Sequence, residues 1–125
     1  MNNSLDGMES KSIIGEKSLA FAKRIAKCYR FLTKKKHEDV MSKQLLRCGT
    51  SVGANVREGQ YAQSKKDFIS KMNIALKEAG ETDYWLDVIH SAGYFTDEEY
   101  ASLNADNKEL LKILASIVKT SKENS

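Results

Sequence analysis

Two consecutive stretches decide the fold of this chain: Cys48-Gly-Thr-Ser-Val-Gly-Ala-Asn-Val-Arg-Glu-Gly59 and Phe68-Ile-Ser-Lys-Met-Asn-Ile-Ala-Leu-Lys-Glu-Ala-Gly-Glu-Thr-Asp-Tyr-Trp-Leu86. Both have apolar residues at helical spacing, and the first is rich in small side chains. Because the distance between two helices is set by the side chains at their contact, the first stretch predicts a close helix pair. The second stretch also places carboxylates among its apolar positions.

Length and composition predict one soluble helical domain. The chain has 125 residues, of which 41% are hydrophobic and 30% charged, and it has no proline, the commonest helix breaker. No stretch approaches the roughly 18 uninterrupted apolar residues of a membrane span. The polar segment 1–12 is expected to be a disordered lead-in and not a signal peptide. Cys28 and Cys48 show no metal-ligand spacing, so we interpret them as reduced core thiols of a cytoplasmic protein.

Charge is distributed unevenly along the chain. Residues 1–62 hold 12 Lys and Arg against 6 Asp and Glu, whereas residues 63–125 hold 8 against 11. A basic half joined to an acidic half has three interpretations: a face that binds a polyanion, self-association between unlike faces, or surface charge without a function.

Hydrophobic periodicity predicts four amphipathic helices: from about Ile13 to Lys36, from Glu38 to Ala62, from Lys65 to Ser91, and from Thr96 to about Thr120. Short joints between helices of this length predict an all-α, antiparallel, up-down-up-down four-helix bundle over residues 13–120. Residues 121–125 are expected to be a frayed tail.

Local signals mark the ends of the predicted helices. Ser64 precedes Asp67 by three residues, and Thr96 precedes Glu99 in the same way, as in a capping box. Gly93 suits a C-terminal stop, because glycine adopts the left-handed backbone that ends many helices. Glu38 and Asp39 suit the positive N-terminal end of the second helix.

The third helix has more apolar surface than one buried stripe requires. Beside its main seam, Ile74, Trp85 and Val88 form a second apolar stripe. No helix is central in a small four-helix bundle, so this surface predicts self-association.

Carboxylates near the helix contacts raise the question of a metal site. Di-metal sites in bundles use Glu-x-x-His pairs from two helices, but this chain has only His37 and His90, and neither follows a glutamate by three residues. The sequence also lacks a Gly-x-Ser-x-Gly elbow and a phosphate-binding loop. We therefore expect no enzyme activity, no metal, no cofactor and no small-molecule substrate.

Polar residues beside the seams are instead predicted to act in packing and assembly. This set comprises Asn55, Glu58, Lys71, Glu78, Glu81 and Trp85. Buried carboxylates are tolerated when they are paired. Their expected partners are Lys71, Arg57, an asparagine or a neighbouring chain, and such pairs are predicted to set the register between chains.

The strongest binding signal is a cation row on the first helix, which we call the basic row: Lys23, Lys27, Arg30, Lys34, Lys35 and Lys36. The first four recur at 4-3-4 spacing and project opposite the seam of Phe21 and Ile25. Cations at one-turn intervals can follow a phosphate backbone of RNA or DNA. The alternative interpretation is a solvated lysine face. In a ring of such bundles the row would be repeated, and avidity would strengthen a weak contact.

Several motifs resemble the four-helix bundle family of 23S rRNA-intervening-sequence proteins. They are Gln44-Leu-Leu-Arg, Ser51-Val-Gly-Ala-Asn-Val-x-Glu58, Ser64-x-x-Asp-Phe-Ile-x-Lys71 and Ala75-Leu-Lys-Glu-Ala-x-Glu-Thr-x-Tyr-Trp-Leu86, with weaker similarity at Ile14-x-x-Lys-Ser-x-x-Phe-Ala and Gly93-Tyr. The similarity extends over nearly the whole chain apart from its two ends.

The resemblance implies a cytoplasmic bacterial homopentamer of four-helix bundles, in a family whose members mostly lack an assigned activity. A related branch is the accessory variability determinant proteins of diversity-generating retroelements, which bind nucleic acid and a reverse transcriptase. The chain is therefore expected to be a non-enzymatic, homo-oligomeric adaptor associated with nucleic acid. The alternative is a structural or protein-interaction scaffold that binds no nucleic acid, including a reverse-transcriptase accessory partner.

Overall fold

The computed structural model describes the backbone of residues 3–124 and the side chains of residues 13–124. Within this part the protein is all-α, with no strand. Its four helices are α1 (Asn3–Lys34), α2 (Met41–Gln60), α3 (Lys65–Ser91) and α4 (Asp97–Glu123). None of the described helices is long and apolar enough to cross a lipid bilayer.

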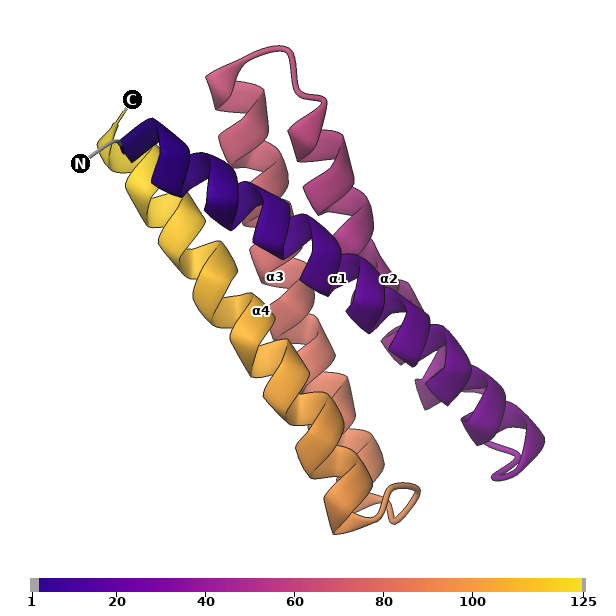
Figure 1. Cartoon of the computed structure of the whole chain (residues 1–125). Helices are drawn as coiled ribbons and strands as arrows, with labels where there is room; N and C mark the ends of the chain where they lie inside the picture. The colour runs from indigo at the N-terminus through magenta and orange to yellow at the C-terminus, as the bar shows by residue number, and fades with distance from the viewer. Residues whose placement is uncertain (1–2, 125) are drawn as a thin grey trace.

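Each helix contacts two others: α1 lies against α2 and α4, and α3 lies against the same two helices. Figure 1 shows both termini at the same end of the molecule as the α2–α3 connection, and the other two connections at the opposite end. It also shows α1 and α4 diverging from the end that holds the termini toward the α3–α4 connection.

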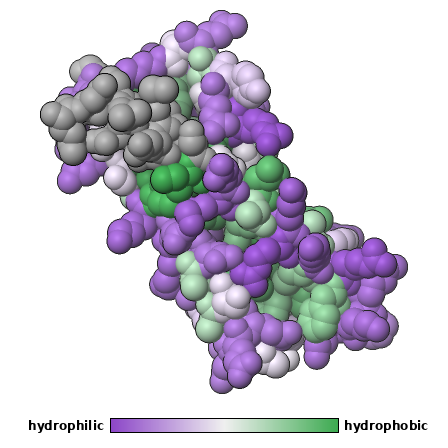
Figure 2. All heavy atoms as spheres, in the orientation of Figure 1, coloured by the Kyte–Doolittle hydropathy of each residue, from purple (hydrophilic) through white to green (hydrophobic). Residues whose placement is uncertain are grey.

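The buried core follows the predicted seams. On α3 the buried residues are Phe68, Met72, Ala75, Ala79, Thr82, Leu86 and Ile89, which is the expected stripe. On α1 the residues Ile14, Phe21, Ile25 and Leu32 are at most 1% exposed. These side chains recur every three or four residues, so each helix presents one apolar stripe to the interior. The opposite faces are largely hydrophilic, as Figure 2 shows for the α1 side of the molecule.

The small residues of α2 allow a close approach to α1, as predicted. A Cβ atom added to Gly49 would lie 3.0 Å from two side-chain carbons of Ile25. A Cβ atom added to Gly53 would lie 3.1 Å from the backbone carbonyl oxygen of Ser18. The glycines therefore serve helix packing.

Helix α1 begins earlier than the sequence predicted. The expected start was about Ile13, after a disordered lead-in over residues 1–12, but the helix is continuous from Asn3. Residues 1–2 lie outside the described part of the chain. The extension is understandable because adding a residue to an existing helix costs little, whereas starting a new helix is unfavourable. At the other end of the chain, α4 runs past the expected Thr120 to Glu123.

Helix α2 is shorter than predicted, and the side chain of Glu38 explains its start. The carboxylate accepts hydrogen bonds from the backbone N–H groups of Met41 (2.9 Å) and Ser42 (2.8 Å), and from Val40. Glu38 therefore precedes the helix and satisfies its first donors, where the sequence had placed it inside the helix. The prediction that Glu38 suits the positive N-terminal end of this helix is confirmed.

Helices α1 and α2 each end two residues before the predicted Lys36 and Ala62. The predicted signals at both ends of α3 and at the start of α4 are confirmed. The Ser64 hydroxyl accepts a hydrogen bond from the Asp67 N–H at 3.0 Å, at the start of α3. Thr96 and Glu99 form a complete capping box at the start of α4. Gly93 follows α3 with a φ of 90°, a conformation that glycine adopts without strain.

Candidate nucleic-acid interface

The basic row lies on the exposed face of α1 and on the turn that follows it. All six residues are exposed: Lys23, Lys27, Arg30, Lys34, Lys35 and Lys36. Phe21 and Ile25 hold the opposite face of the helix in the core, with 1% and 0% exposure. Because the buried stripe fixes the rotation of α1, the first four cations point away from the bundle along one line.

Two other cations of α1 are neutralised by α4. The Lys17 Nζ atom lies 2.5 Å from the Glu109 carboxylate, and the Arg24 Nη1 atom lies 2.6 Å from the Asp106 carboxylate. Arg24 also donates a hydrogen bond to the Ser102 hydroxyl at 2.9 Å. The hydrogen bond and the charge of Glu109 raise the pKa of Lys17.

The basic row differs from this paired set. Among the side chains of residues 13–124, none of its six cations forms an ion pair. Helix α1 therefore carries two kinds of positive charge, one engaged with α4 and one directed to solvent. The solvent-directed charge remains available to an external polyanion.

The carboxylates predicted to act in assembly are paired within the chain. Arg47 on α2 contacts two of the three through its two terminal nitrogens: Nη1 lies 3.2 Å from a carboxylate oxygen of Glu78, and Nη2 contacts Glu81. The sequence had named Lys71, Arg57, an asparagine or a neighbouring chain as partners of the carboxylates. Among the described residues, Glu78 and Glu81 pair with Arg47 and not with Lys71 or Arg57. Lys71, one of the named partners, lies 4.0 Å from Glu58.

The remaining members of the assembly set have local contacts. The side-chain amide of Asn55 donates a hydrogen bond to the Ser51 carbonyl oxygen at 2.9 Å, one turn earlier in α2. Trp85 is partly buried against the core and makes an edge-to-face contact with Tyr84, with ring centroids 5.0 Å apart. Ile74 and Tyr84 on α3 are 39% and 59% exposed.

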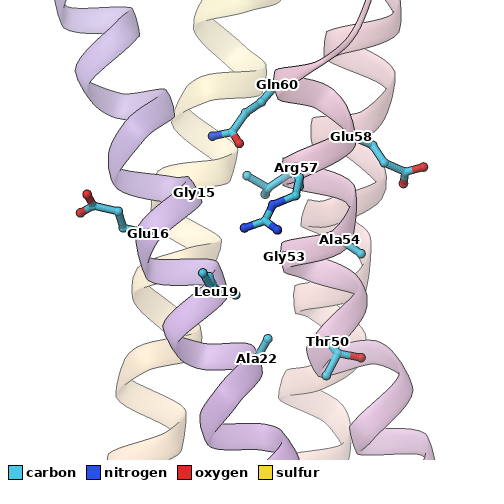
Figure 3. Close-up of a pocket in the computed structure, with 11 residues that line it drawn as sticks. Gly15, Glu16, Leu19, Ala22, Thr50, Gly53, Ala54, Arg57, Glu58 and Gln60 are labelled. Carbon is cyan, nitrogen blue, oxygen red and sulfur yellow. The ribbon is translucent and has the colours of Figure 1, made fainter.

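A groove of about 860 Å³ lies between α1 and α2. Its residues are Gly15, Glu16, Leu19, Ala22, Thr50, Gly53, Ala54, Val56, Arg57, Glu58 and Gln60. Figure 3 shows Arg57 and Gln60 extending between the two helices, whereas Glu16 and Glu58 point outward from the groove. The small side chains on both helices create this hollow, which we call the α1–α2 groove.

No group of three or more His, Cys, Asp or Glu side chains with metal-binding geometry occurs in the described part of the protein. His90 lies 2.8 Å from the Asp97 carboxylate and stacks on the Tyr100 ring, which fixes the α3–α4 connection. Burial raises the pKa of the Cys28 thiol to about 12, and burial is also the main cause that raises the pKa of Cys48. Both cysteines are free thiols.

Sequence reasoning missed Arg47 as the partner of Glu78 and Glu81, and it missed the ion pairs between α1 and α4. Arg47 has 4-4-3 spacing to Ser51, Asn55 and Glu58, so it shares the helix face that the sequence had already placed beside the seam. Similarly, Lys17 and Arg24 are seven residues apart on one side of α1, and Asp106 and Glu109 are three apart on α4. Matching these spacings across neighbouring helices would have identified the pairs.

The sequence model of the family described as 23S rRNA-intervening sequence protein matches residues 10–116 of this chain. The chain belongs to the 23S rRNA-intervening sequence protein family. The resemblance inferred from the motifs of α2 and α3 is confirmed.

A solved structure supports the same assignment. The chain is 53% identical to a protein of unknown function from the S23 ribosomal protein family of Bacteroides thetaiotaomicron, with a TM-score of 0.87. The similarity covers 88% of this chain and 98% of that protein. A comparison with curated proteins found no match.

All residues of the basic row and of the assembly set lie inside the part that matches the 23S rRNA-intervening sequence protein family. The solved structure of the same family agrees with the four-helix, all-α architecture of the described residues. Membership of the family assigns no activity, because the similar structure is itself described as one of unknown function. Function must be argued from the surface chemistry.

Proposed function

We propose that this member of the 23S rRNA-intervening sequence protein family is a non-enzymatic, homo-oligomeric adaptor that associates with nucleic acid through the basic row of α1. The observation that carries the proposal is the row itself: six exposed cations without an ion pair in the described residues, beside two that α4 neutralises. We place this function in the bacterial cytoplasm.

The physical basis is the release of counterions. A nucleic acid carries a condensed layer of cations, and lysine or arginine contacts to its phosphates release them. The row offers contacts at intervals of about one helical turn, or roughly 5.4 Å along α1. Such contacts carry no sequence information, so we expect association with many sequences.

We further propose that the four helices form an up-down-up-down bundle and that the bundles assemble into a ring-like homopentamer. Exposed apolar side chains support self-association, among them Ile74 and Tyr84 on α3. The row of one bundle gives a weak contact, and a ring would present several rows to one strand. Avidity would then raise the overall affinity.

The test is a salt titration of binding to a labelled oligonucleotide. The combined change Lys23→Glu, Lys27→Glu and Arg30→Glu is expected to weaken binding at least tenfold and to make the slope of log K against log salt shallower by about 2 to 3. The matched control carries Lys108→Glu, Lys112→Glu and Lys119→Glu on α4, which change the net charge equally. Equal losses in both triple variants would contradict a specific role for α1.

The second candidate is a protein-interaction scaffold that binds no nucleic acid, including an accessory partner of a reverse transcriptase. The observation that favours it is an exposed apolar side chain on α1: Leu19 lines the α1–α2 groove and is 40% exposed. Absence of oligonucleotide binding at low salt, with an intact oligomer by size-exclusion chromatography, would favour this scaffold over the adaptor.

A further inference from the structure

A second groove lies between α1 and the start of α4, where Figure 1 shows the two helices diverging. Its volume is about 410 Å³, within the usual range of small-molecule pockets of roughly 300–1,000 Å³. The lining residues are Arg24, Lys27, Cys28, Phe31, Phe95, Glu99 and Leu103. We call it the α1–α4 groove.

The lining of the α1–α4 groove is aromatic and apolar. Phe95 and Leu103 are each only 6% exposed, so they belong to the core, whereas Phe31 is partly exposed and packs against it. Burial raises the pKa of Cys28 to about 12, so this thiol carries no charge at neutral pH. The groove therefore offers a flat aromatic ring beside uncharged apolar surface.

The three charged residues at the edge of the groove differ in whether other residues of the chain already hold their side chains. Arg24 is held by Asp106 and Ser102. Glu99 is held in the capping box, where its carboxylate accepts a hydrogen bond from the Thr96 N–H at 2.8 Å. Lys27 forms no ion pair with any described residue, so the available charge at this edge is positive.

The α1–α4 groove is continuous with the basic row, because Lys27 belongs to both. Phe31 follows Lys27 by one helical turn and lies on the groove side of the row. The Lys36 amino group, also in the row, lies 5.7 Å from the centre of the Phe31 ring. The Phe31 ring thus has one cation of the basic row a helical turn before it and another, Lys36, over its ring.

We propose that the α1–α4 groove receives an unpaired nucleobase, stacked on Phe31, of a single strand whose phosphates lie along the basic row. Proteins that bind single-stranded nucleic acid combine a positive track for the backbone with aromatic rings that stack on bases. A duplex keeps its bases stacked inside, so it can use the row and not the groove. This inference rests on the proposed association with nucleic acid.

The α1–α2 groove on the other side of α1 suits this ligand less well. It is larger, but no aromatic side chain is among the residues that line it. Its aliphatic side chains give a base no ring to stack on. The choice between the two grooves follows from aromatic content and from continuity with the basic row, to which Lys27 of the α1–α4 groove belongs and no residue of the α1–α2 groove does.

The experiment compares single strands and duplexes by fluorescence anisotropy at one salt concentration. The probes are a labelled 20-nucleotide uridine RNA, its thymidine DNA counterpart, and a 20-base-pair duplex of each backbone. We expect the protein to bind the single strands at least fivefold more tightly than the duplexes. Similar results for RNA and DNA would show that the groove recognises the base and not the sugar.

The test variant is Phe31→Leu, which keeps apolar bulk and removes the ring. It is expected to weaken single-strand binding about 5-fold to 100-fold, since one base–aromatic stack contributes roughly 1–3 kcal/mol. Duplex binding should stay within twofold. The matched control is Tyr29→Leu, an aromatic change on the same helix that does not line the groove. It should leave the single-strand preference intact.

The possible failures are distinguishable. If Phe31→Leu affects both probes equally or neither, the groove assignment is overturned, and the charge-reversal variants still test the basic row alone. If no probe binds, both proposals fail. If Phe31→Leu changes the oligomer size, the groove is covered by another copy and the assignment is likewise overturned.

A second measurement covers the case in which Phe31→Leu does not fold. A 4-thiouridine RNA is cross-linked to the unmodified protein, and the attached peptides are identified by mass spectrometry. Cross-links are expected within residues 27–31 or 95–103. Cross-links confined to other segments would overturn the proposal.

Discussion

The Nη1 atom of Arg47 on α2 lies 3.2 Å from a carboxylate oxygen of Glu78 on α3. The second terminal nitrogen of the same guanidinium contacts Glu81, one turn further along α3, so one cation holds two carboxylates. These charges lie beside the exposed side chain of Ile74, and they are satisfied inside one chain. A partner that covers Ile74 therefore has no need to supply an opposite charge.

The first prediction concerns this Arg47 contact. Glu81→Gln removes one of its two ion pairs, and both groups are more than a third exposed, so we expect the free energy of unfolding to fall by only about 0.5 kcal/mol. Urea titration and size-exclusion chromatography provide the measurements. A change in oligomer size would show that Glu81 sets the register between chains, and an unchanged profile and melt would refute that role.

The second prediction concerns Glu38 and pH. Burial alone would raise the pKa of this carboxyl group, but hydrogen bonds from the backbone N–H groups of Met41, Ser42 and Val40 outweigh it and lower the pKa. A lowered pKa in the folded state means that the carboxylate stabilises the protein above its unfolded-state pKa of about 4.3. This stabilisation is lost as the pH falls through the folded-state value.

We therefore expect Glu38→Gln to lower the free energy of unfolding by about 1 kcal/mol at pH 7, as for loss of a helix cap. The difference from the unmodified protein should shrink below about pH 4, where both side chains are neutral. Urea titrations from pH 3 to pH 7 measure this difference. Asp39→Asn is the control, because it removes an exposed neighbouring charge. A difference independent of pH would contradict the role of the Glu38 charge.

The third prediction compares two glycines in helices. A Cβ atom at Gly80 would have no heavy atom within 4 Å, so Gly80→Ala is expected to raise the free energy of unfolding by about 0.8–1.0 kcal/mol through helix propensity. At Gly53 the same atom would lie 3.1 Å from the Ser18 carbonyl oxygen, and a backbone atom moves only with its whole helix.

Gly53→Ala is therefore expected to lower the free energy of unfolding by about 1 kcal/mol, because overpacking outweighs the gain in propensity. Chemical denaturation of the two variants at equal protein concentration is the measurement. If both alanines stabilise the protein, α1 and α2 can separate without cost, and the close approach at Gly53 is not a constraint on the fold.

Which features the sequence could predict depended on how local their causes are. The bounds of α3 agree with the expectation because Ser64 and Gly93 act on the backbone beside them. The start of α2 differed because the Glu38 carboxylate accepts hydrogen bonds from the backbone N–H groups of Met41 and Ser42. Glu38 therefore lies before the first turn of the helix and not inside it. The partners of Glu78 and Glu81 depend on how α2 and α3 are rotated against each other. Periodicity predicts which face of a helix a residue lies on, but it does not predict which residue of the neighbouring helix it contacts.

The basic row illustrates the same distinction. Its exposure follows from the seam on α1, so the spacing of Lys23 and Lys27 was sufficient to predict it. The α1–α4 groove was not predictable, because Phe31 and Phe95 are distant in sequence and line the same groove only through the packing of the helices. A site formed by one helix is readable from periodicity, and a site formed between helices requires their packing.

The fourth prediction concerns Asn107, a polar residue with no exposed surface in the core. Its side-chain nitrogen donates a hydrogen bond to the Ala79 carbonyl oxygen on α3 at 3.0 Å, but its Oδ1 atom has no hydrogen-bond partner in the described structure. A buried acceptor without a partner costs about 1–3 kcal/mol. Asn107→Leu keeps the number and branching of the side-chain heavy atoms, with somewhat larger methyl groups, and removes both polar atoms. We therefore expect it to raise the free energy of unfolding by about 1 kcal/mol.

Asn107→Ala is the matched control, since it also removes the polar atoms but leaves a cavity, and it is expected to lower the free energy of unfolding. Urea titration of both variants separates the polar cost from the packing. If Asn107→Leu destabilises the protein as much as Asn107→Ala does, the bond to Ala79 stabilises the α3–α4 contact by more than the unpaired Oδ1 costs. Asn107 would then be a residue that fixes the alignment of these two helices.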